Sequence, residues 1–252
     1  MKERMLVLAK AYPTISKKYQ VLLCIGGVTE GGEWRRIYPI PLDAYVKAGK
    51  FKKREWIEYE IVDENPEHRR ESKRVDPDSI KPTGERAEEW EVRKLLKERL
   101  TTIEKLKERY EDDGTSLGVV KPILEDFKMK KREKAKEWER RLLGQQTLDG
   151  RPAVPIDLVD KWIGYDFRCH PKCNGHSCMC VDIEVGNLYR KLRRKKLSED
   201  EIYRKLRYRL YHWMMERDLF FIMGTESKYG EWIIVSLFYP RRQLTLTELS
   251  SP

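Results

Sequence analysis

Trp56-Ile-Glu-Tyr-Glu-Ile-Val62 is the stretch that most clearly determines a secondary structure in the first quarter of this 252-residue chain. Successive side chains of a β-strand point to opposite faces of the sheet. The two faces here are Trp56, Glu58 and Glu60 on one side and Ile57, Tyr59 and Ile61 on the other. This alternation predicts a strand with one buried face.

Three shorter runs before it are also rich in β-branched and aromatic residues. They are Met5–Ala9, Gln20–Ile25 and Trp34–Tyr38. Glycine pairs at 26–27 and 31–32 mark the turn between the second and third runs. Four or five strands within about sixty residues predict a small barrel of the OB or SH3-like kind over residues 1–63.

The remainder of the chain predicts a mixed α+β protein. Residues 64–83 are polar and contain three prolines, which indicates a linker. Residues 84–143 predict a charged helical hairpin, with one helix from Glu85 to Glu111 and a second from Lys121 to Leu143. Residues 144–240 predict a compact α+β unit stapled by zinc, with helices after 181 and 198 and two final strands, and residues 241–252 predict a flexible tail.

Four of the five cysteines lie within twelve residues, in Cys169-His-Pro-Lys-Cys173-Asn-Gly-His176-Ser-Cys178-Met-Cys180. Zinc is held by four nitrogen or sulfur donors in a tetrahedron, and a short loop brings two donors to one ion. We expect a structural zinc site with Cys169, Cys173, His176 and Cys180 as ligands. Cys178 is the alternative to either late ligand, and free thiols on a loop are the alternative to metal.

The charge balance favours anionic partners. Net charge is +10 at pH 7, and half of the twenty residues from 190 to 209 are Lys or Arg. Basic side chains interleaved with tyrosine are typical of nucleic-acid binding, since Arg neutralises phosphate and Tyr stacks on unpaired bases. The residues predicted to bind nucleic acid are Arg193, Arg194, Lys195, Lys196, Arg204, Arg207, Tyr208 and Tyr211. A solvated charged face without a ligand is the alternative.

A catalytic role has weaker support in the sequence. Asp182 and Glu184, followed much later by Glu226-Ser-Lys228, fit the acidic and lysine residues of a metal-dependent nuclease. The pattern is short, and it also fits charged residues of a hairpin turn. The sequence contains no phosphate-binding loop, dinucleotide fingerprint or nucleophile elbow.

No apolar run approaches the ~20 residues that cross a bilayer, and the N-terminus has too short an apolar stretch for a signal peptide. We therefore expect a cytoplasmic protein without a membrane partner. In a reducing compartment, clustered cysteines indicate metal binding rather than disulfides.

Several motifs together resemble a family of uncharacterised prokaryotic proteins. They are Ala11-Tyr-Pro-Thr-Ile-Ser-Lys-Lys-Tyr19, Trp34-Arg-Arg-Ile-Tyr-Pro-Ile40, Cys173-Asn-Gly-His176 and Leu237-Phe-Tyr-Pro240. The N-terminal part is similar to OB-type barrels of prokaryotic conflict systems. Neither resemblance implies an activity or catalytic residues.

The C-terminal tail resembles the peptide with which replication and repair proteins bind the sliding clamp. Gln243 and Leu246 match that peptide and Leu249 takes the first place of its hydrophobic pair, whereas Ser250 departs from the second. A clamp partner would favour DNA over RNA. The predicted function is therefore a nucleic-acid-binding accessory protein with structural zinc, acting in DNA replication, repair or defence. A metal-dependent nuclease and a protein–protein adaptor are the alternatives.

Overall fold

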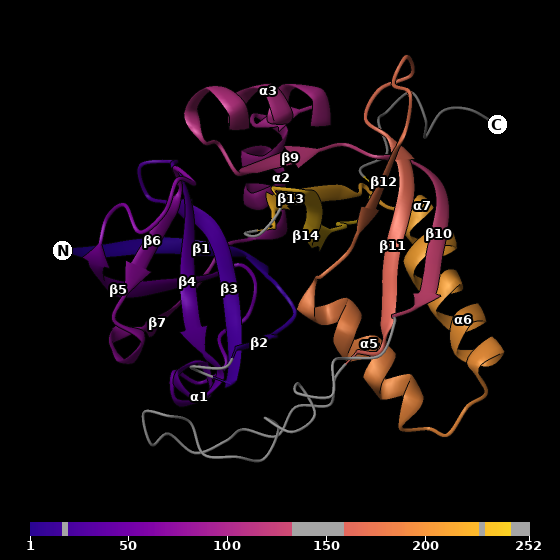
Figure 1. Ribbon diagram of the computed structural model, residues 1–252, viewed down its shortest axis with the longest axis horizontal. Coiled ribbons are helices and arrows are strands. Elements are labelled where there is room, and N and C mark those ends of the chain that lie inside the picture. Colours follow the sequence, from indigo (N-terminus) through magenta and orange to yellow (C-terminus); the bar gives the residue numbers. More distant parts are fainter. Residues whose placement is uncertain (17–19, 133–158, 227–229, 243–252) are drawn as a thin grey trace.

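The computed structural model describes residues 1–16, 20–132, 159–226 and 230–242, and it begins with a β-barrel (Figure 1). The barrel wall consists of β1 (Lys2–Lys10), β3 (Gln20–Thr29), β4 (Trp34–Pro41), β5 (Glu55–Asp63) and β6 (Ser72–Val75). Two strands extend it, namely β2 (Thr14–Ser16) beside β3 and β7 (Lys81–Arg86) beside β5. Helix α1 (Leu42–Lys47) follows β4, and the single turn η1 (Pro77–Ser79) precedes β7.

Pairing of β1 on both sides closes the barrel. β1 lies antiparallel to β3 and to β5, β3 pairs with β4, and β5 pairs with β6. The last seam is parallel and joins β4 to β6. The interior is filled by apolar side chains that include Met5, Val7, Leu23, Ile25, Ile37, Ile57 and Tyr59. The predicted N-terminal barrel is therefore confirmed, as is the alternation of β5, whose outward glutamates are exposed.

The apolar run of β1 does not alternate because both of its faces are buried. Met5 and Val7 point into the barrel, whereas Leu6 and Leu8 pack outward with Val119, Phe220 and other residues of the C-terminal sheet. A strand covered on both faces reads as a continuous hydrophobic run. The first strand thus connects the barrel core to the rest of the molecule.

The linker predicted over residues 64–83 is wrong, since this segment contains β6, η1 and the start of β7. β6 carries Ser72, Lys73 and Arg74 in place of apolar residues, so its sequence lacks the hydrophobic alternation of a strand. Its position depends on polar contacts instead. The Lys73 ammonium, which is largely buried, donates to the Glu64 carbonyl at 2.5 Å and lies 3.1 Å from the Glu64 carboxylate.

The first helix of the predicted hairpin is interrupted. Residues 85–111 form the end of β7, α2 (Glu89–Lys97), the short strand β8 (Leu100–Thr101) and most of α3 (Ile103–Asp113). β8 pairs with β9 (Leu117–Val120), and the Thr102 hydroxyl then accepts a hydrogen bond from the Lys105 amide at 3.3 Å. That bond caps a new helix, because the first backbone N–H groups of a helix have no partner within it.

The second predicted helix, over 121–143, is wrong where the structure describes it. Residues Ile123–Lys131 form strand β10, which pairs with β11 (Lys161–Arg168). A bulge between Leu124 and Asp126 puts Leu124 and Phe127 on the same face of the sheet, opposite Phe167 and Tyr165. Their spacing of three therefore imitated a helix. Residues 133–143 lie outside the described part of the chain.

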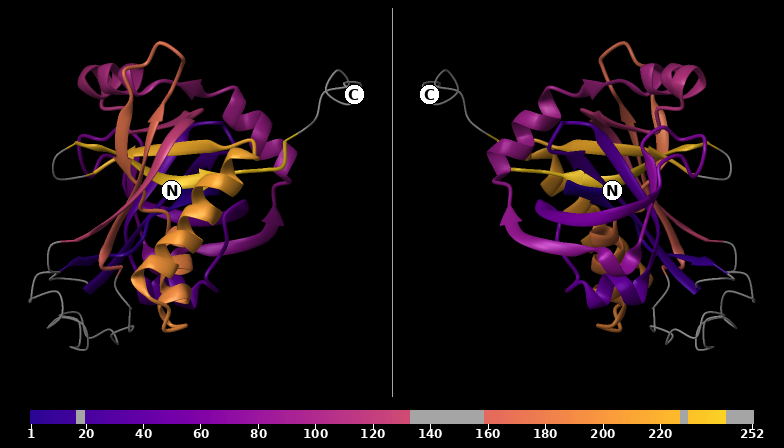
Figure 2. Two further views of the ribbon diagram at one scale, coloured as in Figure 1. Left: turned by 90° about the vertical axis from the view of Figure 1, so that its right-hand side faces the viewer. Right: turned by 90° about the vertical axis from the view of Figure 1, so that its left-hand side faces the viewer.

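Two sheets and a layer of helices make up the C-terminal unit (Figure 2). The sheets have the strand orders β10-β11-β12 (His176–Met179) and β14 (Trp232–Phe238)-β13 (Phe220–Thr225)-β9-β8. The helices are α5 (Ile183–Arg193), α6 (Glu199–Arg207), the π-helical turn η2 (Tyr208–His212) and α7 (Trp213–Met215). Both final strands and the Ser198–Glu201 capping box are as predicted.

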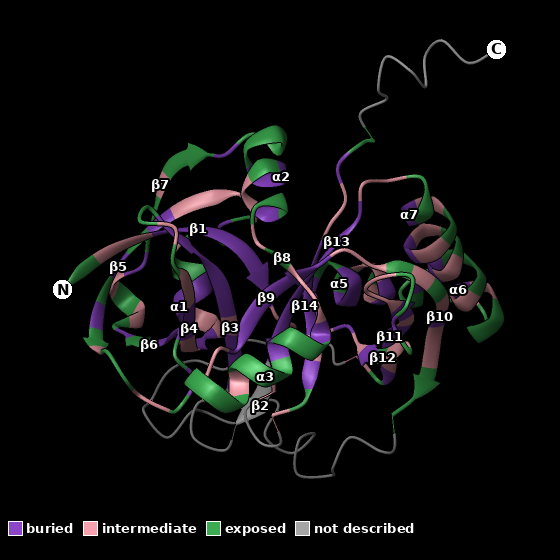
Figure 3. Cartoon of the chain, turned by 90° about the horizontal axis from the view of Figure 1, so that it is seen from above, coloured by how far each residue is buried: buried purple, intermediate pink, exposed green. Residues whose placement is uncertain are grey.

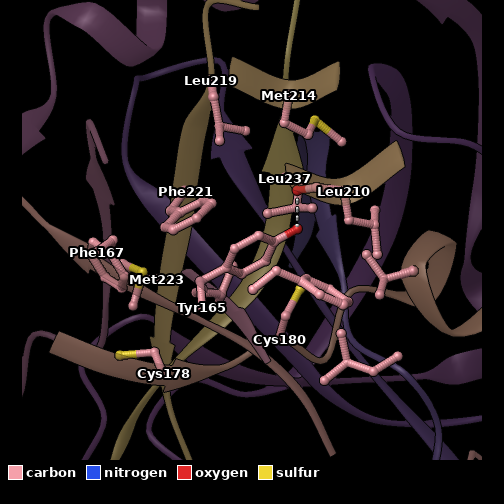
Figure 4. Packing of buried hydrophobic residues seen from close by; sticks show 14 of the residues in the cluster. Tyr165, Phe167, Cys178, Cys180, Leu210, Met214, Leu219, Phe221, Met223 and Leu237 are labelled. Carbon is pink, nitrogen blue, oxygen red and sulfur yellow. Dashed lines mark hydrogen bonds between the residues drawn. The ribbon is translucent and has the colours of Figure 1, made fainter. Parts of the chain in front are cut away.

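The core of this unit is aromatic. Tyr165 and Phe167 of β11 pack against Phe221 of β13, and the buried Tyr165 hydroxyl donates to the Leu210 carbonyl at 3.0 Å (Figure 4). Buried side chains continue from this core through the sheet of β13 and β14 to the barrel (Figure 3). Among the described residues, no helix is both long enough and apolar enough to span a lipid bilayer.

Candidate metal centre

The turn between β11 and β12 brings two cysteine sulfurs together. The Cys173 amide donates to the His170 carbonyl at 3.0 Å, and the Gly175 amide donates to the Cys173 Sγ at 3.3 Å. Gly175 has φ +91°, a conformation that only glycine adopts without strain. The Sγ atoms of Cys169 and Cys173 lie 3.6 Å apart, well beyond the ~2.05 Å of a disulfide.

His176, the first residue of β12, supplies the third donor. Its Nε2 lies 3.5 Å from the Cys169 Sγ and 3.1 Å from the Cys173 Sγ. Pairing of His176 with Phe167 in the sheet fixes the position of its backbone. Three of the ligands predicted from the sequence are therefore in mutual contact.

The fourth donor is Glu104, in the first turn of α3. Its carboxylate oxygens lie 3.3 Å from the Cys169 Sγ, 3.7 Å from the Cys173 Sγ and 3.0 Å from the His176 Nε2. Thr102 caps this helix end and so places Glu104 against the β11–β12 turn, a proximity visible in Figure 1. The sequence prediction missed Glu104, because a glutamate 65 residues before the cluster looks like any other charged helix residue.

These four residues, called the donor cluster below, have the dimensions of a tetrahedral site. The distances between their donor groups lie between 3.0 and 3.7 Å, with the Glu104 Oε2 facing Cys169 and its Oε1 facing Cys173 and His176. A tetrahedron with metal–ligand bonds of about 2.0–2.3 Å has edges of about 3.4–3.8 Å. His170 is a further donor, since a ring nitrogen of it lies within 4.8 Å of Glu104, Cys169 and Cys173. The group could hold a metal ion.

The protonation states follow from this crowding. Burial raises the pKa of Cys169 to about 12, and the Cys173 thiol and the Glu104 carboxylate add to that shift. Burial alone would raise the pKa of Glu104, but hydrogen bonds from the helix backbone, Thr102 and Cys169 lower it to about 2. Burial lowers the pKa of His176. A neutral imidazole and an ionised carboxylate are the forms that coordinate metal, whereas the thiol must lose its proton.

Two family models divide the chain at the end of the barrel region. Residues 1–99 match the model described as Domain of unknown function (DUF8758), and residues 99–251 match the one described as Domain of unknown function (DUF8757). The second match covers more than half of the chain. This chain belongs to the DUF8757 family. No curated protein matches it at a significant level.

The DUF8757 region includes all four cysteines of the segment from Cys169 to Cys180. Cys178 and Cys180, however, are not in the donor cluster. Both belong to the hydrophobic core with Tyr165 and Met223 (Figure 4). Burial raises the pKa of the Cys178 thiol to about 11 and raises that of Cys180 as well. The structure therefore does not bring Cys180, or Cys178 in its place, to the donor cluster, where the Glu104 carboxylate lies instead.

The predicted nucleic-acid residues divide into two groups. Five cations are exposed at the end of α5, in the following turn and on α6: Arg193, Arg194, Lys195, Lys196 and Arg204. The Tyr208 ring is exposed nearby, at 65% of its surface. Arg207 instead donates to Asp126 at 2.7 Å, and the Tyr211 hydroxyl donates to the Glu125 carbonyl at 2.8 Å. These two side chains attach the helix to β10 in the described structure.

The nuclease candidates are not assembled into one site. The buried Asp182 caps α5, accepts from the Leu237 amide at 2.7 Å and lies 2.6 Å from the Lys53 ammonium. Glu226 follows Thr225, which pairs with Trp232 at the other end of β14. Leu237 lies five residue steps beyond Trp232 on this strand, about 16 Å at the usual rise. Asp182 therefore joins the barrel to the C-terminal unit, with Glu184 3.1 Å from the same ammonium.

Four predicted residues fall outside the described part of the chain. One is Lys228, the lysine of the nuclease pattern. The others are Gln243, Leu246 and Leu249, on which the resemblance to a clamp-binding peptide depends. The interpretation of the tail therefore stays a prediction from its sequence.

Proposed function

We propose that this protein binds nucleic acid through the exposed cations of the α5–α6 surface, defined as Arg193, Arg194, Lys195, Lys196 and Arg204. The observation that carries the proposal is that these five side chains are exposed along the end of α5, the following turn and α6. Neutralising backbone phosphates with such cations releases counterions and gives salt-dependent affinity. The exposed Tyr208 ring adds a surface on which an unpaired base stacks.

The topology of the barrel supports an oligonucleotide-binding role. Taken in chain order, its five wall strands close in the order one, two, three, five, four, with a short helix between the third and fourth. This is the arrangement of an OB barrel, a fold that often binds oligonucleotides and oligosaccharides. Function still depends on specific residues rather than on the fold, so the α5–α6 surface is the primary hypothesis.

Zinc is the ion that we propose for the donor cluster. Thiolate ligands favour zinc, copper(I) and iron–sulfur clusters, whereas imidazole and carboxylate ligands in the same tetrahedron favour zinc. The ion would join three elements, since Glu104 comes from α3, the cysteines from the turn and His176 from β12. It would therefore stabilise the fold of the C-terminal unit directly.

The proposed cellular role is that of an accessory factor in DNA replication, repair or defence, in the cytoplasm. The preference for DNA over RNA derives from the tail sequence around Gln243 and Leu246, with the sliding clamp as its proposed partner. The nuclease alternative has less support, because Asp182 and Glu226 lie at opposite ends of β14.

A gel-shift titration at several salt concentrations tests the α5–α6 surface. Replacing its five cations with Ala should weaken binding at least tenfold and reduce the salt dependence, by about 0.9 in slope for each duplex phosphate that is no longer neutralised. Arg207 is left intact because it is half-buried and attaches the helix to Asp126 of β10, whereas Arg193, 3.5 Å from Asp160, is exposed. Single- and double-stranded DNA and RNA are compared, with and without Mg²⁺.

The matched control removes five exposed cations from other parts of the molecule: Lys2, Lys81, Lys94, Lys97 and Lys105. Both variants lose the same charge, so a difference between them reports on position rather than on net charge. Equal affinity of the two variants at every salt concentration would reject the α5–α6 surface as the binding site. Mg²⁺-dependent cleavage would instead support the nuclease.

A further inference from the structure

A cleft of about 690 Å³ lies where the two family regions meet. The barrel contributes the β3–β4 turn at residues 32–35 together with part of the β5–β6 connection and β6, and most of the remaining lining comes from residues 98–101, α3 and β9. Ligand sites occur preferentially at such boundaries, and their volumes are about 300–1,000 Å³. This space, called the junction cleft below, therefore has the position and the size of a ligand site.

Cations outnumber acids in the lining of the junction cleft. The three carboxylates belong to Glu33, Glu71 and Glu98, and the five cationic side chains are Arg35, Arg70, Lys73, Arg99 and Arg109. Three of these cations have close carboxylate partners, in the pairs Arg35–Glu3, Arg70–Asp113 and Lys73–Glu64 at 2.9, 2.6 and 3.1 Å. Arg99 and Arg109 lack such a close partner among the described residues.

Two of the three acidic side chains are also engaged in contacts of their own. The Glu33 carboxylate lies 2.5 Å from the Arg35 guanidinium. The buried Glu71 carboxylate accepts hydrogen bonds from the amide and the hydroxyl of Ser116 at 2.7–3.0 Å, and the buried Arg36 donates to the carbonyl of the same Ser116. The negative charges of Glu33 and Glu71 are therefore balanced by neighbouring groups and do not offset Arg99 and Arg109.

Arg99 is held in place by neutral carbonyl groups. Its guanidinium donates to the Leu95 carbonyl of α2 at 3.1 Å and to the Gly32 carbonyl of the barrel turn at 3.0 Å. A guanidinium has five N–H donors, so three are left for a ligand. Its one ion pair within the described chain is with the adjacent Glu98 at 3.9 Å, and the Glu98 side chain is 58% exposed. Arg99 is therefore oriented in advance, while most of its charge stays unbalanced.

Arg109 is the second guanidinium without a carboxylate partner. It is exposed on α3 and forms no hydrogen bond or ion pair with another described residue. It lines the same cleft as Arg99. Guanidinium groups bind phosphate through two parallel N–H bonds, and these charge-assisted bonds are stronger than bonds between neutral groups.

We propose that the junction cleft binds a phosphorylated ligand of nucleotide size, with Arg99 and Arg109 as the residues that hold its phosphate. Two unbalanced guanidinium groups match the charge of about −2 on a phosphate monoester at pH 7, whereas one carboxylate would leave a positive charge. The half-buried Trp34 and the 42% exposed Leu100 supply apolar surface for the organic part of the ligand. None of the α5–α6 residues lines this cleft, so the inference does not depend on that surface.

Calorimetric titration of the full-length protein tests this inference. The probes are inorganic phosphate, AMP, adenosine, and a short oligonucleotide with and without a 5′ phosphate. The oligonucleotides are titrated into the variant that lacks the five α5–α6 cations, so that binding to that surface does not contribute. Saturable heat is expected from AMP and the phosphorylated oligonucleotide, and none from adenosine or the unphosphorylated strand. Tighter binding of AMP identifies a free nucleotide as the source of the phosphate, and tighter binding of the oligonucleotide identifies the end of a strand.

Four variants locate the phosphate in the cleft. Arg109→Ala should weaken AMP binding by about tenfold or more, the scale of one charge-assisted hydrogen bond, without lowering the melting temperature. Arg99→Lys keeps the charge but loses the planar fork, so it should also weaken binding. Glu98→Gln should bind AMP more tightly, because it removes the carboxylate that competes for Arg99. Lys105→Ala removes one charge from the same helix outside the lining, and it should behave as the parent.

Two outcomes would overturn the inference. One is the absence of saturable heat from inorganic phosphate, AMP and the phosphorylated oligonucleotide alike. The other is AMP binding that is as tight in both Arg109→Ala and Arg99→Lys as in the parent. Neither outcome affects the salt-dependent binding assigned to the α5–α6 surface, and loss of that binding would leave the AMP titration unchanged. The two proposals therefore fail independently.

Discussion

The two halves of the cysteine segment have the same residue type and opposite environments. Cys169 and Cys173 precede Gly175 on a turn, and their sulfurs lie 3.6 Å apart at the donor cluster. Cys178 and Cys180 follow on β12 and beyond it, in the aromatic core. The difference shows that donor spacing in the sequence identifies a candidate metal-binding segment, whereas secondary structure decides which of its donors meet.

The largest effect is expected from replacing a cysteine of the first half of the segment. Cys173→Ser replaces the buried sulfur of a proposed ligand with a hydroxyl, and we expect loss of stoichiometric metal together with a drop in melting temperature of at least 10 °C. The reason is that binding energy for a structural ion, about 10–16 kcal/mol in small zinc-finger peptides at pH 7, is folding energy. Elemental analysis and thermal unfolding of protein purified without a metal-binding tag measure both quantities. A metal-free parent that is fully folded would contradict the metal centre.

Competition between protons and the metal for the cysteine sulfurs should give the second-largest effect. It makes metal affinity depend on pH through Cys169 and Cys173, and not through Cys178 and Cys180. Cys169 has a pKa of about 12 in the metal-free cluster, above the ordinary value of 9.0, so metal has to displace its proton and affinity should rise with pH. For the metal-free protein, the free energy of unfolding should instead fall as pH rises. Because the folded pKa exceeds the unfolded one, the stability contributed by this group is full below about pH 9 and is lost as pH rises toward 12.

Chelator titrations at pH 6, 7 and 8, followed by unfolding of the metal-free protein between pH 8 and 10.5, measure the two trends. Cys178→Ala is the control for the chelator titration, since its thiol is outside the cluster; in the unfolding assay it removes a second thiol whose pKa is raised, to about 11, and so should reduce the trend in part. A metal affinity that does not change over these pH values would be inconsistent with thiolate ligation.

Cys178 and Cys180, the second half of the segment, should tolerate substitution better than Cys169 and Cys173. Cys180→Ser puts a more polar hydroxyl into the buried core, which costs about 1–3 kcal/mol when the hydroxyl finds no partner. Cys180→Ala avoids that polar group and leaves a small cavity. We expect both variants to keep one metal ion per chain. Their unfolding free energies should differ from each other by about 1 kcal/mol or more. Loss of the metal from either variant would return Cys180 to the ligand set.

Much of the fold could be read from the sequence, and the failures have physical causes. The alternation in β5 and the apolar run of β1 predicted strands correctly, because hydrophobic burial determined them. β6 was missed because polar residues, Ser72 and Lys73, occupy its buried positions, with the Lys73 ammonium donating to the Glu64 carbonyl. β10 was missed because a bulge between Leu124 and Asp126 interrupts the alternation that a regular strand would show.

The candidate site was predicted only in part, because local sequence determines some of its residues and tertiary packing determines the others. The local turn determines Cys169, Cys173 and His176, so their spacing carried the information. Glu104 reaches them only through tertiary packing of α3, which no local pattern reports. The same limit applies to Arg207, whose pairing with Asp126 of β10 could not be seen while β10 was read as a helix.

The smallest effect, and the sharpest test of the turn itself, is expected from Gly175→Ala. The residue has φ +91°, and a Cβ built there would meet only the Glu125 carboxylate oxygen, at 3.6 Å, so backbone strain rather than a clash is the cost. Such strain amounts to about 1–3 kcal/mol. We expect that loss in unfolding free energy together with a measurable fall in metal affinity, because Gly175 also donates to the Cys173 sulfur. Gly49→Ala is the matched control: its φ is +82° and no atom lies within 4 Å of the added Cβ, but it is remote in sequence from the cysteine segment. Equal loss of stability in both variants, with metal affinity lowered only by Gly175→Ala, would assign the geometry of the ligand pair to this turn. An unchanged metal affinity in Gly175→Ala would show that the cysteines reach the ion without it.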